Sequence, residues 1–457
     1  MTLAQHTGEH LESLLGDRFT TSRGICAAHG TDISHFDPQP PDAVVFPETT
    51  AEVQAIVKAC AATKTPIVPY GVGTSLEGHV HAMKNGVTID LSRMDKILSV
   101  NQDDLDVVVQ PGVRRVQLNQ YLRDTGLFFP IDPGADATLG GMASTRASGT
   151  NAVRYGTMKD NVLSLEVVTA AGEIVRTARR ARKSSAGYDL TRLFVGSEGT
   201  LGVITEVTVR LYGLPEKILS AVCSFDSFEG AIQSVIETIQ VGVPMARIEF
   251  LDEEAIKAVN HTSKLGLPER PTLFLEFHGT EHSVEEQVEL ARDIMTDNGG
   301  QNFEWAKKPE ERSALWAARH DAALSVPAYA TGTRQWWTDV CVPISQLADC
   351  ILATKEDIKE TGLFAPILGH VGDGNFHLGI CAKEGDEDEF KRADALNDRL
   401  VERALSMNGT CTGEHGIGRG KIHFLEKELG NAVPLMRSIK SALDPDNIMN
   451  PGKVLEV

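Results

Sequence analysis

Three glycine-rich loops lie in the first half of the chain, and they constrain its fold more than any other feature of the sequence. The loops are PYGVGTSLEG at 69–78, DPGADATLGGMASTRASGTN at 132–151 and GSEGTLGVIT at 196–205. Each follows or opens a predicted strand, and glycine leaves backbone N–H groups unobstructed by Cβ atoms. One such loop is an ordinary turn. Three of them together predict a site for a flat cofactor that carries phosphate groups.

Hydrophobic periodicity predicts a mixed α+β chain. Short apolar strands alternate with amphipathic helices at the following residues: strands at 43–47, 66–69, 87–91 and 106–110, and helices at 51–64 and 113–126. After Leu214-Pro215 the pattern changes to longer strand–helix alternation, which indicates a second α+β domain. We therefore expect domains at 1–217 and 218–420, and a C-terminal segment at 421–457.

Charge and missing motifs exclude several function classes. The sequence contains neither GxGxxG nor GxxxxGK[ST], which disfavours an ordinary nicotinamide site and a P-loop. The formal net charge is −19, which disfavours nucleic-acid binding because a phosphate backbone attracts a basic surface. An acidic surface suits a small-molecule enzyme or a basic protein partner.

Cysteine usage and the N-terminal residues suggest a compartment. Seven cysteines form no CxxC pair, which favours free thiols in a reducing environment. No apolar run approaches the length of a transmembrane helix. The first residues, MTLAQHTGEHLESLLGDRF, are neither a secretory signal nor a transit peptide. We expect a bacterial cytoplasmic protein, with membrane-peripheral attachment left open. A mitochondrial location would require a presequence that this sequence lacks.

The strongest cluster of chemically active residues lies in the second domain. ILGHVGDGNFHLGI at 367–380 predicts a β-hairpin with a two-residue Asp373-Gly374 turn, which makes His370 and His377 cross-strand neighbours. Two imidazoles so placed suit one divalent metal, and Glu414 in GTCTGEHGIGRGK supplies a third ligand, with His415 beside it. Taken singly, each histidine is better explained as a buried strand residue. Their symmetric placement favours a catalytic metal site for zinc, manganese or iron.

Two arginines are candidates for binding a substrate anion. Arg319 lies in the predicted helix PEERSALWAARHDAALSV, where it can form a bidentate pair with a carboxylate, and Arg334 lies in the next predicted strand. Most arginines are simply solvated, so this assignment rests on the neighbouring metal site. Trp336 and Trp337 are expected in the core or a pocket wall, and His79 and His81 are expected to be structural.

Together these segments resemble the FAD-binding domain of the vanillyl-alcohol-oxidase superfamily. The matching residues are IVPYGVGTSLEGHV, LFFPIDPGADATLGGMASTRASGTNAVRYGTM and RKSSAGYDLTRLFVGSEGTLGVIT, and the C-terminal half resembles the D-lactate dehydrogenase branch through GHVGDGNFH, GTCTGEHGIGRGK and DPDNIMNPGK. The resemblance implies a PCMH-type FAD-binding domain of two α+β subdomains, a ferredoxin-like α+β cap and a tail that returns to the first domain.

The resemblance also implies roles for individual residues. It assigns His370, His377 and Glu414 to one divalent metal, His415 to general-base catalysis and Arg319 to the substrate carboxylate. It assigns non-covalent FAD, because Thr74 follows Gly73 where some relatives carry a flavin-linked histidine. The FAD-binding residues implied are Pro69, Gly71, Gly73, Thr74, Ser75, Pro133, Thr138, Gly140, Gly141, Gly149, Asn151, Glu198, Gly199, Ile204 and Asn450.

The expected reaction is oxidation of D-lactate, or of a similar D-2-hydroxy monocarboxylic acid, to the 2-keto acid. The metal would acidify the substrate hydroxyl, His415 would take its proton, and the Cα hydride would pass to flavin N5. Electrons would continue to cytochrome c, a quinone or an electron-transfer flavoprotein, and a homodimer is a candidate assembly.

Several alternatives stay open at this point. D-2-hydroxyglutarate and glycolate dehydrogenases are near relatives, although Ala323 and Trp337 replace a threonine and a lysine of the former. An alkyl-glycerone-phosphate-synthase-like transferase would share the fold and FAD but would not need the metal ligands. A non-catalytic FAD-binding subunit would not need His415.

Overall fold

The computed structural model describes residues 3–263, 265–306 and 308–457, and it divides into two compact units. Unit 1 comprises Met1–Ser148, Gly156–Leu214 and Glu414–Val457, and unit 2 comprises Gly149–Tyr155 and Pro215–Gly413. The predicted domain limits at 217/218 and 420/421 stay predictions. The compact units change at 214/215 and at 413/414, and seven residues at 149–155 belong to unit 2.

Unit 1 contains two larger sheets. The first has the order β1-β2-β4-β3, in which β2, β4 and β3 are parallel: β1 (Phe19–Thr20), β2 (Ala43–Val45), β4 (Val87–Asp90) and β3 (Ile67–Tyr70). The second is antiparallel and has the order β5-β6-β10-β8-β9: β5 (Ile97–Asn101), β6 (Asp106–Val109), β10 (Val203–Arg210), β8 (Val162–Val168) and β9 (Ile174–Arg176). A two-stranded sheet pairs β7 (Leu127–Phe128) with β11 (Tyr212–Gly213).

The helices of unit 1 are mostly short. They are α1 (Gln5–Leu15), α2 (Arg23–His29), α3 (Thr50–Ala62), α4 (Arg115–Leu122), α5 (Leu139–Thr145), α7 (Met158–Asn161), α8 (Leu190–Phe194), α16 (Ile422–Leu429) and α17 (Ala432–Leu443). Helix α3 shows how the sequence determines them. Thr49 caps its N-terminus by accepting the Glu52 N–H, and buried Val53, Val57 and Cys60 recur at helical spacing.

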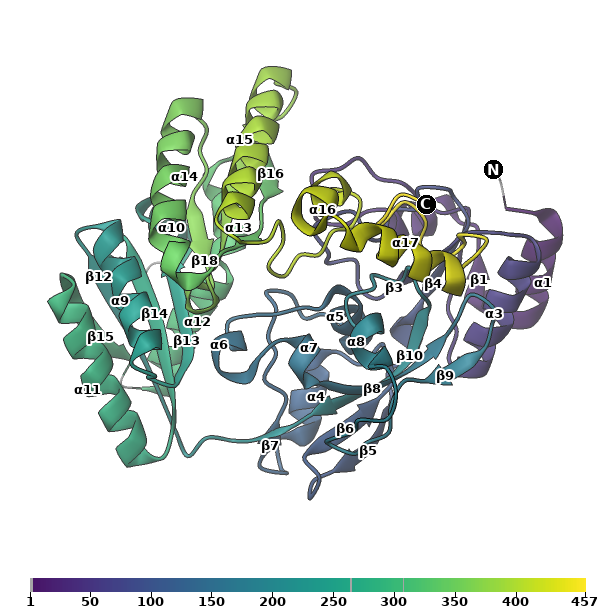
Figure 1. Ribbon diagram of the computed structural model, residues 1–457, viewed down its shortest axis with the longest axis horizontal. Helices are drawn as coiled ribbons and strands as arrows, with labels where there is room; N and C mark the ends of the chain where they lie inside the picture. The colour runs from purple at the N-terminus through teal and green to yellow at the C-terminus, as the bar shows by residue number, and fades with distance from the viewer. Residues whose placement is uncertain (1–2, 264, 307) are drawn as a thin grey trace. The chain divides into compact units, whose positions relative to one another are not determined.

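Unit 2 contains one large antiparallel sheet with the order β15-β12-β14-β13-β18-β19-β16 (Figure 1). Its strands are β12 (Lys217–Phe225), β13 (Met245–Leu251), β14 (Thr272–Gly279), β15 (Gly300–Ala306), β16 (Thr333–Trp337), β18 (Ile367–Gly369) and β19 (Asn375–Lys383), and β17 (Val340–Cys341) also pairs with β19. The first four strands of unit 2 are β12, β13, β14 and β15, and they lie side by side in the order β15-β12-β14-β13. In order along the chain these are the fourth, first, third and second strands of the unit. With helices after the first and third strands, this is the predicted ferredoxin-like arrangement, to which the helix α10 (Glu253–Ser263) is added between the second and third strands.

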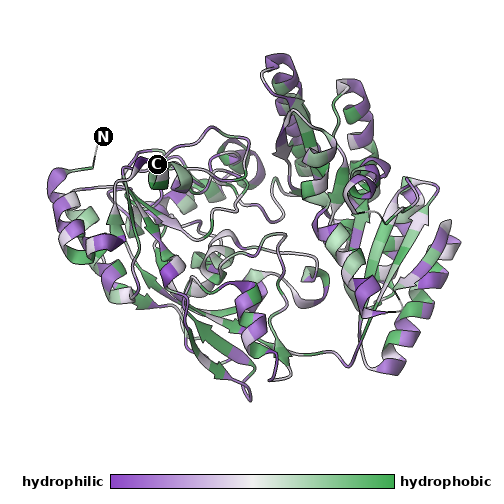
Figure 2. Cartoon of the chain, turned by 180° about the vertical axis from the view of Figure 1, so that it is seen from behind, coloured by the Kyte–Doolittle hydropathy of each residue, from purple (hydrophilic) through white to green (hydrophobic). Residues whose placement is uncertain are grey.

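The helices of unit 2 are α6 (Ala152–Tyr155), α9 (Phe228–Gln240), α10 (Glu253–Ser263), α11 (Glu281–Asp297), α12 (Pro309–His320), α13 (Ala322–Tyr329), α14 (Leu347–Thr361) and α15 (Glu387–Ser406). Helices α9 and α11 pack side by side on the β12–β14 part of the sheet. The strands of this sheet are mainly hydrophobic, whereas the helices carry both hydrophobic and hydrophilic residues (Figure 2). The polar residues described below are therefore exceptions in an apolar sheet, and buried polar groups of this kind need a partner or a ligand.

Candidate functional site

A cleft in unit 1 lies where the glycine-rich loops meet the ends of the strands. It is lined by Pro69, Tyr70, Gly71, Leu91, Pro111, Thr138, Gly140, Gly141, Ser144, Gly199, Gly202 and Ile204. Pro69 and Tyr70 end β3, and Leu91 directly follows the parallel strand β4. The cleft therefore opens at the carboxyl ends of the parallel strands, where α/β sheets bind ligands.

Glycine is required at the walls of this cleft. A Cβ atom on Gly71 would lie 2.4 Å from Thr138 Oγ1, and one on Gly140 would lie 2.5 Å from Pro111 Cβ. Thr138 also caps α5, because its hydroxyl accepts the Gly141 N–H. Small residues thus let the backbone approach both a neighbouring loop and a ligand, as a flat dinucleotide requires.

The structure brings some of the predicted FAD residues to this cleft and leaves others outside its lining. Those in the lining are Pro69, Gly71, Thr138, Gly140, Gly141, Gly199 and Ile204. Those outside it are Gly73, Thr74, Ser75, Pro133, Glu198 and Asn450 in unit 1, and Gly149 and Asn151 in unit 2. Five residues of the lining were not among the predicted ones: Tyr70, Leu91, Pro111, Ser144 and Gly202. Tyr70, Ser144 and Gly202 lie in the glycine-rich loops, whereas nothing in the local sequence of Leu91 and Pro111 distinguishes the end of one strand from another.

Beside Gly199, a buried polar cluster joins the third glycine-rich loop to the C-terminal tail. Asn450 Nδ2 donates to the carbonyls of Glu198 at 2.7 Å and His79 at 3.2 Å, and the Glu198 carboxylate accepts the N–H groups of Ile417 and Gly418. Ser197 Oγ, Asn450 Oδ1 and His79 Nδ1 are buried and have no hydrogen-bond partner among the described residues. Unpartnered buried polar atoms next to the cleft fit a bound polar ligand.

His79 and Glu198 form a buried ion pair within this cluster, with Nε2 and Oε2 3.1 Å apart. Burial by itself would lower the pKa of His79, but the charge of Glu198 and the hydrogen bond to it outweigh burial and raise that pKa. Burial would raise the pKa of Glu198, and the His79 charge and the N–H donors of 417 and 418 lower it instead. The pair is therefore stable in its charged form.

His370 and His377 lie together in unit 2, although not in the predicted register. The Cα partner of His377 is Leu368, and His370 follows the end of β18 in a loop that contains a 3₁₀ turn at Val371–Asp373. The predicted two-residue turn is therefore wrong, because the connection between the strands is longer. The two rings still approach each other, with centroids 5.6 Å apart.

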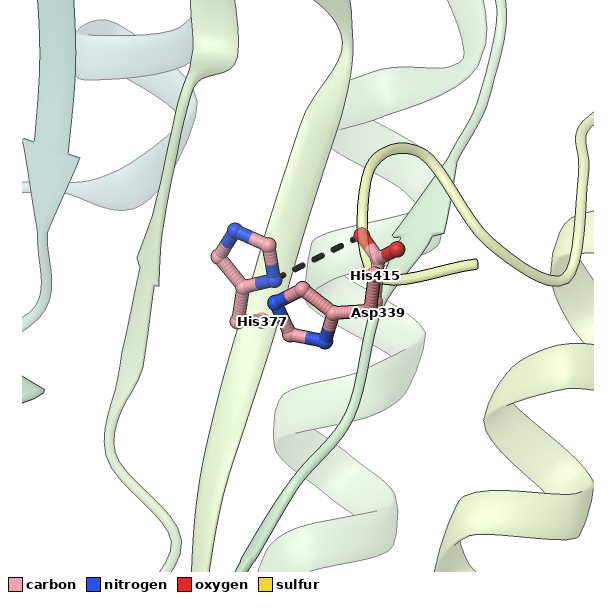
Figure 3. Close-up of side chains that lie close together, drawn as sticks. All are labelled: Asp339, His377 and His415. Carbon is pink, nitrogen blue, oxygen red and sulfur yellow. Dashed lines mark ion pairs between the residues drawn. The ribbon is translucent and has the colours of Figure 1, made fainter. Parts of the chain in front are cut away.

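Each of these imidazoles is oriented through its Nδ1 atom. His370 Nδ1 lies 2.8 Å and 2.9 Å from the two carboxylate oxygens of Glu249. His377 Nδ1 lies 3.1 Å from the Thr338 carbonyl and 3.5 Å from Asp339 Oδ1 (Figure 3). With both Nδ1 atoms engaged, a metal would be bound through Nε2, as in carboxylate–histidine–metal triads.

Glu414 and His415 directly follow the last residue of unit 2, so the covalent chain itself brings them to this part of the molecule. Gly413 lies so close to Asn375 and Asp339 that a Cβ atom on it would be 2.3 Å from Asn375 Nδ2, and Thr412 Oγ1 donates to Asp339 at 2.7 Å. Potential ligand atoms of His370, His377 and Glu414 lie within 4.8 Å of one another, as do those of Asp339, His377 and His415 (Figure 3). Two imidazoles and a carboxylate form a donor set that suits a divalent metal.

Arg319 on α12 is buried and points to the same part of unit 2. Its Nη2 donates to Glu249 Oε2 at 2.5 Å, whereas its Nε has no partner among the described residues. A buried guanidinium with an unused donor fits a carboxylate ligand. Arg334 lies on β16 and, by strand alternation, on the opposite face from Trp337.

Three cysteines are poor candidates for a nucleophile. All seven are free, and burial raises the pKa values of Cys60, Cys223 and Cys341 to about 12. A thiol with such a pKa is protonated and unreactive at neutral pH.

Comparisons with known proteins agree with this geometry. Residues 214–454 match the family "FAD linked oxidases, C-terminal domain", and residues 41–178 match the family "FAD binding domain". The "Probable D-lactate dehydrogenase, mitochondrial" of Danio rerio is 53% identical over 97% of this chain and 90% of that protein. The mitochondrial "D-lactate dehydrogenase (cytochrome)" of Arabidopsis thaliana is 47% identical over 97% of this chain and 79% of that protein.

The solved structure of p-cresol methylhydroxylase with bound substrate has a TM-score of 0.81 at 17% identity, covering 98% of this chain and 96% of that one. At this identity the likeness shows the fold alone. It confirms the predicted α+β fold class with a PCMH-type FAD-binding domain.

The predicted bacterial cytoplasmic location is wrong. The relatives at 53% and 47% identity are both named as mitochondrial proteins, and this finding overturns the expected bacterial cytoplasmic location. The prediction relied on the composition of the first residues, and that composition does not decide the compartment. Among the described residues, no helix is both long and apolar enough to cross a membrane.

Proposed function

Because this chain belongs to the FAD-linked oxidase family, and within it to the D-lactate dehydrogenases, we propose that it oxidises D-lactate, or a similar small D-2-hydroxy monocarboxylic acid, to the 2-keto acid. One observation supports this class of substrate: the buried Arg319 binds the same carboxylate, Glu249, as the potential metal ligand His370. His370 in turn lies close to the other potential ligands, His377 and Glu414. An arginine and a divalent metal together recognise a carboxylate with a neighbouring hydroxyl.

The cleft of unit 1 is the proposed site of FAD. When bound, FAD supplies the hydride acceptor for the substrate Cα hydrogen. Gly71, Gly140 and Gly141 would admit the cofactor close to the backbone, and the unpartnered Ser197 Oγ and Asn450 Oδ1 would bind its polar groups. We infer non-covalent attachment, because Thr74 stands after Gly73.

His370, His377 and Glu414 are the proposed ligands of one divalent metal: zinc, manganese or iron. When bound, the metal supplies Lewis-acid polarisation of the substrate hydroxyl and carboxylate oxygens. Three protein ligands leave coordination positions open, which is the mark of a catalytic metal site rather than a structural one.

Arg319 and His415 act directly on the substrate in this proposal. Arg319 binds the carboxylate through the donors that Glu249 does not use. The His415 imidazole then accepts the hydroxyl proton as the α-hydroxyl becomes a carbonyl. Proton removal by a positioned base typically contributes 10²- to 10⁴-fold to such a rate.

Purified, FAD-loaded protein should be mixed with D-lactate under anaerobic conditions while the visible flavin absorption band is followed. We expect rapid bleaching with D-lactate, little with L-lactate or D-2-hydroxyglutarate, and loss of bleaching after treatment with a chelator. Bleaching by D-2-hydroxyglutarate or glycolate alone would move the assignment to those relatives, and no bleaching with any 2-hydroxy acid would favour the transferase alternative.

The role of His415 is tested separately. His415→Ala should retain FAD and metal but bleach at least about 100-fold more slowly with D-lactate, because the substrate proton has lost its acceptor. Full turnover by this variant with every 2-hydroxy acid tested would contradict the base assignment. His423→Ala, which changes another histidine in the C-terminal part of the chain, is the control and should bleach at the wild-type rate.

A further inference from the structure

Glu249 is a buried carboxylate in the middle of the unit 2 sheet. It lies on β13 between β14 and β18, and only 1% of the residue is exposed. Neighbouring residues of β13, such as Phe250 and Leu251, are apolar and fully buried. A carboxylate in such surroundings is destabilising unless charged or polar partners satisfy it.

Two residues of the proposed site satisfy this carboxylate at the same time. Both of its oxygens lie within 2.9 Å of His370 Nδ1, and Oε2 also accepts the Arg319 Nη2 donor at 2.5 Å. His370 and Arg319 come from separate elements, the loop after β18 and helix α12. Glu249 therefore joins the proposed metal ligand to the proposed carboxylate-binding residue.

The direction of these hydrogen bonds follows from their chemistry. An ionised carboxylate only accepts hydrogen bonds, so His370 must donate from Nδ1. A neutral imidazole that is protonated on Nδ1 carries its lone pair on Nε2, which is the form that binds a metal. The same carboxylate fixes the Arg319 guanidinium through one nitrogen and leaves Nε for a ligand.

We propose that Glu249 is a positioning residue: it holds His370 in its metal-binding tautomer and fixes Arg319 for the substrate carboxylate. This inference rests on the function proposed above. Glu249 touches neither substrate nor metal in this arrangement and acts through its two partners. His377 is oriented by other groups, since its Nδ1 lies 3.1 Å from the Thr338 carbonyl and 3.5 Å from Asp339 Oδ1.

The test is Glu249→Gln, which keeps the shape of the side chain. The amide is uncharged and replaces one of the two accepting oxygens with a donating NH₂ group. Because His370 Nδ1 lies against both oxygens, one of them on the side of Arg319, the amide cannot reproduce the full set of accepted hydrogen bonds. We expect metal affinity, measured by competition with a chelator and by metal content, to fall about 10- to 100-fold. The KM for D-lactate should rise at saturating metal, because Arg319 is no longer fixed, while FAD content stays at the wild-type level.

Glu276→Gln is the matched control. Glu276 is also a buried carboxylate of this sheet, on β14, and it binds Ser220 and His278 rather than His370 or Arg319. This variant should lose comparable stability but keep wild-type metal affinity. Glu249→Asp, which keeps the charge, should recover part of the metal affinity lost in Glu249→Gln.

The outcomes separate the two proposals. Wild-type metal affinity and KM in Glu249→Gln would overturn the positioning role and leave the proposed function intact. A wild-type protein that binds no metal would overturn the metal site and this inference together. If Glu249→Gln does not fold, ¹⁵N NMR of metal-free wild-type protein decides the matter: His370 protonated on Nδ1 supports the inference, and protonation on Nε2 overturns it.

Discussion

At the scale of single residues, the buried His79–Glu198 pair makes the stability of unit 1 depend on pH. The pKa of Glu198 is lowered from 4.5, so its contribution is present above that pH and is lost as the pH falls. The pKa of His79 is raised from 6.5, so its contribution is full below that pH and is lost as the pH rises through the raised value. The pair therefore stabilises unit 1 most between pH 4.5 and pH 6.5, the ordinary pKa values of the two groups.

Urea unfolding of wild type and Glu198→Gln in excess FAD tests this dependence. We expect the variant to lose about 3–5 kcal/mol near pH 5.5, because a buried pair has lost one partner. The difference should shrink as the pH rises through the raised pKa of His79, because His79 then loses its charge. The exposed Glu173→Gln is the control, and a Glu198 effect that does not shrink at any pH above 5.5 at which the protein stays folded would contradict the ion-pair assignment.

Trp337 belongs to the same scale. It lies opposite Gly379 on β19, and a Cβ atom on Gly379 would be 2.8 Å from the indole ring. Strand alternation puts this pair on the face that carries Asp339 and His377. Trp337→Leu should therefore raise kcat/KM for longer 2-hydroxy acids relative to D-lactate by at least about tenfold. The control is Trp305→Leu on the edge strand β15, which should leave the ratio of the two kcat/KM values at the wild-type level. If Trp337→Leu also leaves this ratio unchanged, the indole does not limit substrate size.

At the scale of elements, the connection from β18 to β19 shows how far sequence reasoning reached. The Asp373-Gly374 dipeptide correctly marked a turn, and the two histidines do approach each other. The register was wrong because a local turn pattern does not show that residues 370–374 form a longer loop. The register differs from the predicted one by two positions, and an even shift leaves every side chain on its original face.

Long-range pairing explains what the sequence could not show at this scale. Glu249 lies in the run ARIEFL, which predicts an ordinary strand, and its partners are 70 and 121 residues away along the chain. The only sign of a buried polar site in this run is that it contains the charged residues Arg247 and Glu249. Their partners cannot be identified without knowing which strands lie beside this one. The glycine-rich loops were easier to interpret, because three of them in the first half of the chain together predict a cofactor site, although one alone would be an ordinary turn.

The same connection yields a prediction for Gly374. Its φ is +78°, and a Cβ atom there would lie 2.1 Å from the Val342 carbonyl oxygen. Gly374→Ala should therefore destabilise the protein by more than the roughly 1–2 kcal/mol of a left-handed alanine, and it should reduce metal content by displacing His370. Gly385→Ala is a matched control, since φ is +79° and nothing lies within 4 Å. Equal losses of stability in chemical denaturation, with full metal content in both variants, would contradict the argument.

At the scale of the whole molecule, the formal net charge of −19 bears on how electrons leave the reduced enzyme. The acceptors expected from the sequence are a basic cytochrome c, a quinone or an electron-transfer flavoprotein, and an acidic enzyme would attract the basic cytochrome c from a distance. Opposite net charges steer two proteins together over about a Debye length, which shrinks from roughly 30 Å at 0.01 M salt to 8 Å at 0.15 M.

Salt dependence of reoxidation tests this steering. The second-order rate with cytochrome c should fall about tenfold or more between 0.01 M and 0.15 M salt, because association of an acidic enzyme with a basic acceptor loses its long-range attraction. An uncharged quinone is the internal control: its rate should not change over this range, since it has no charge to be steered. A fast cytochrome c reaction that is independent of salt would show that the acidic surface does not steer the acceptor. A reaction with the quinone alone would assign the electrons to a different carrier.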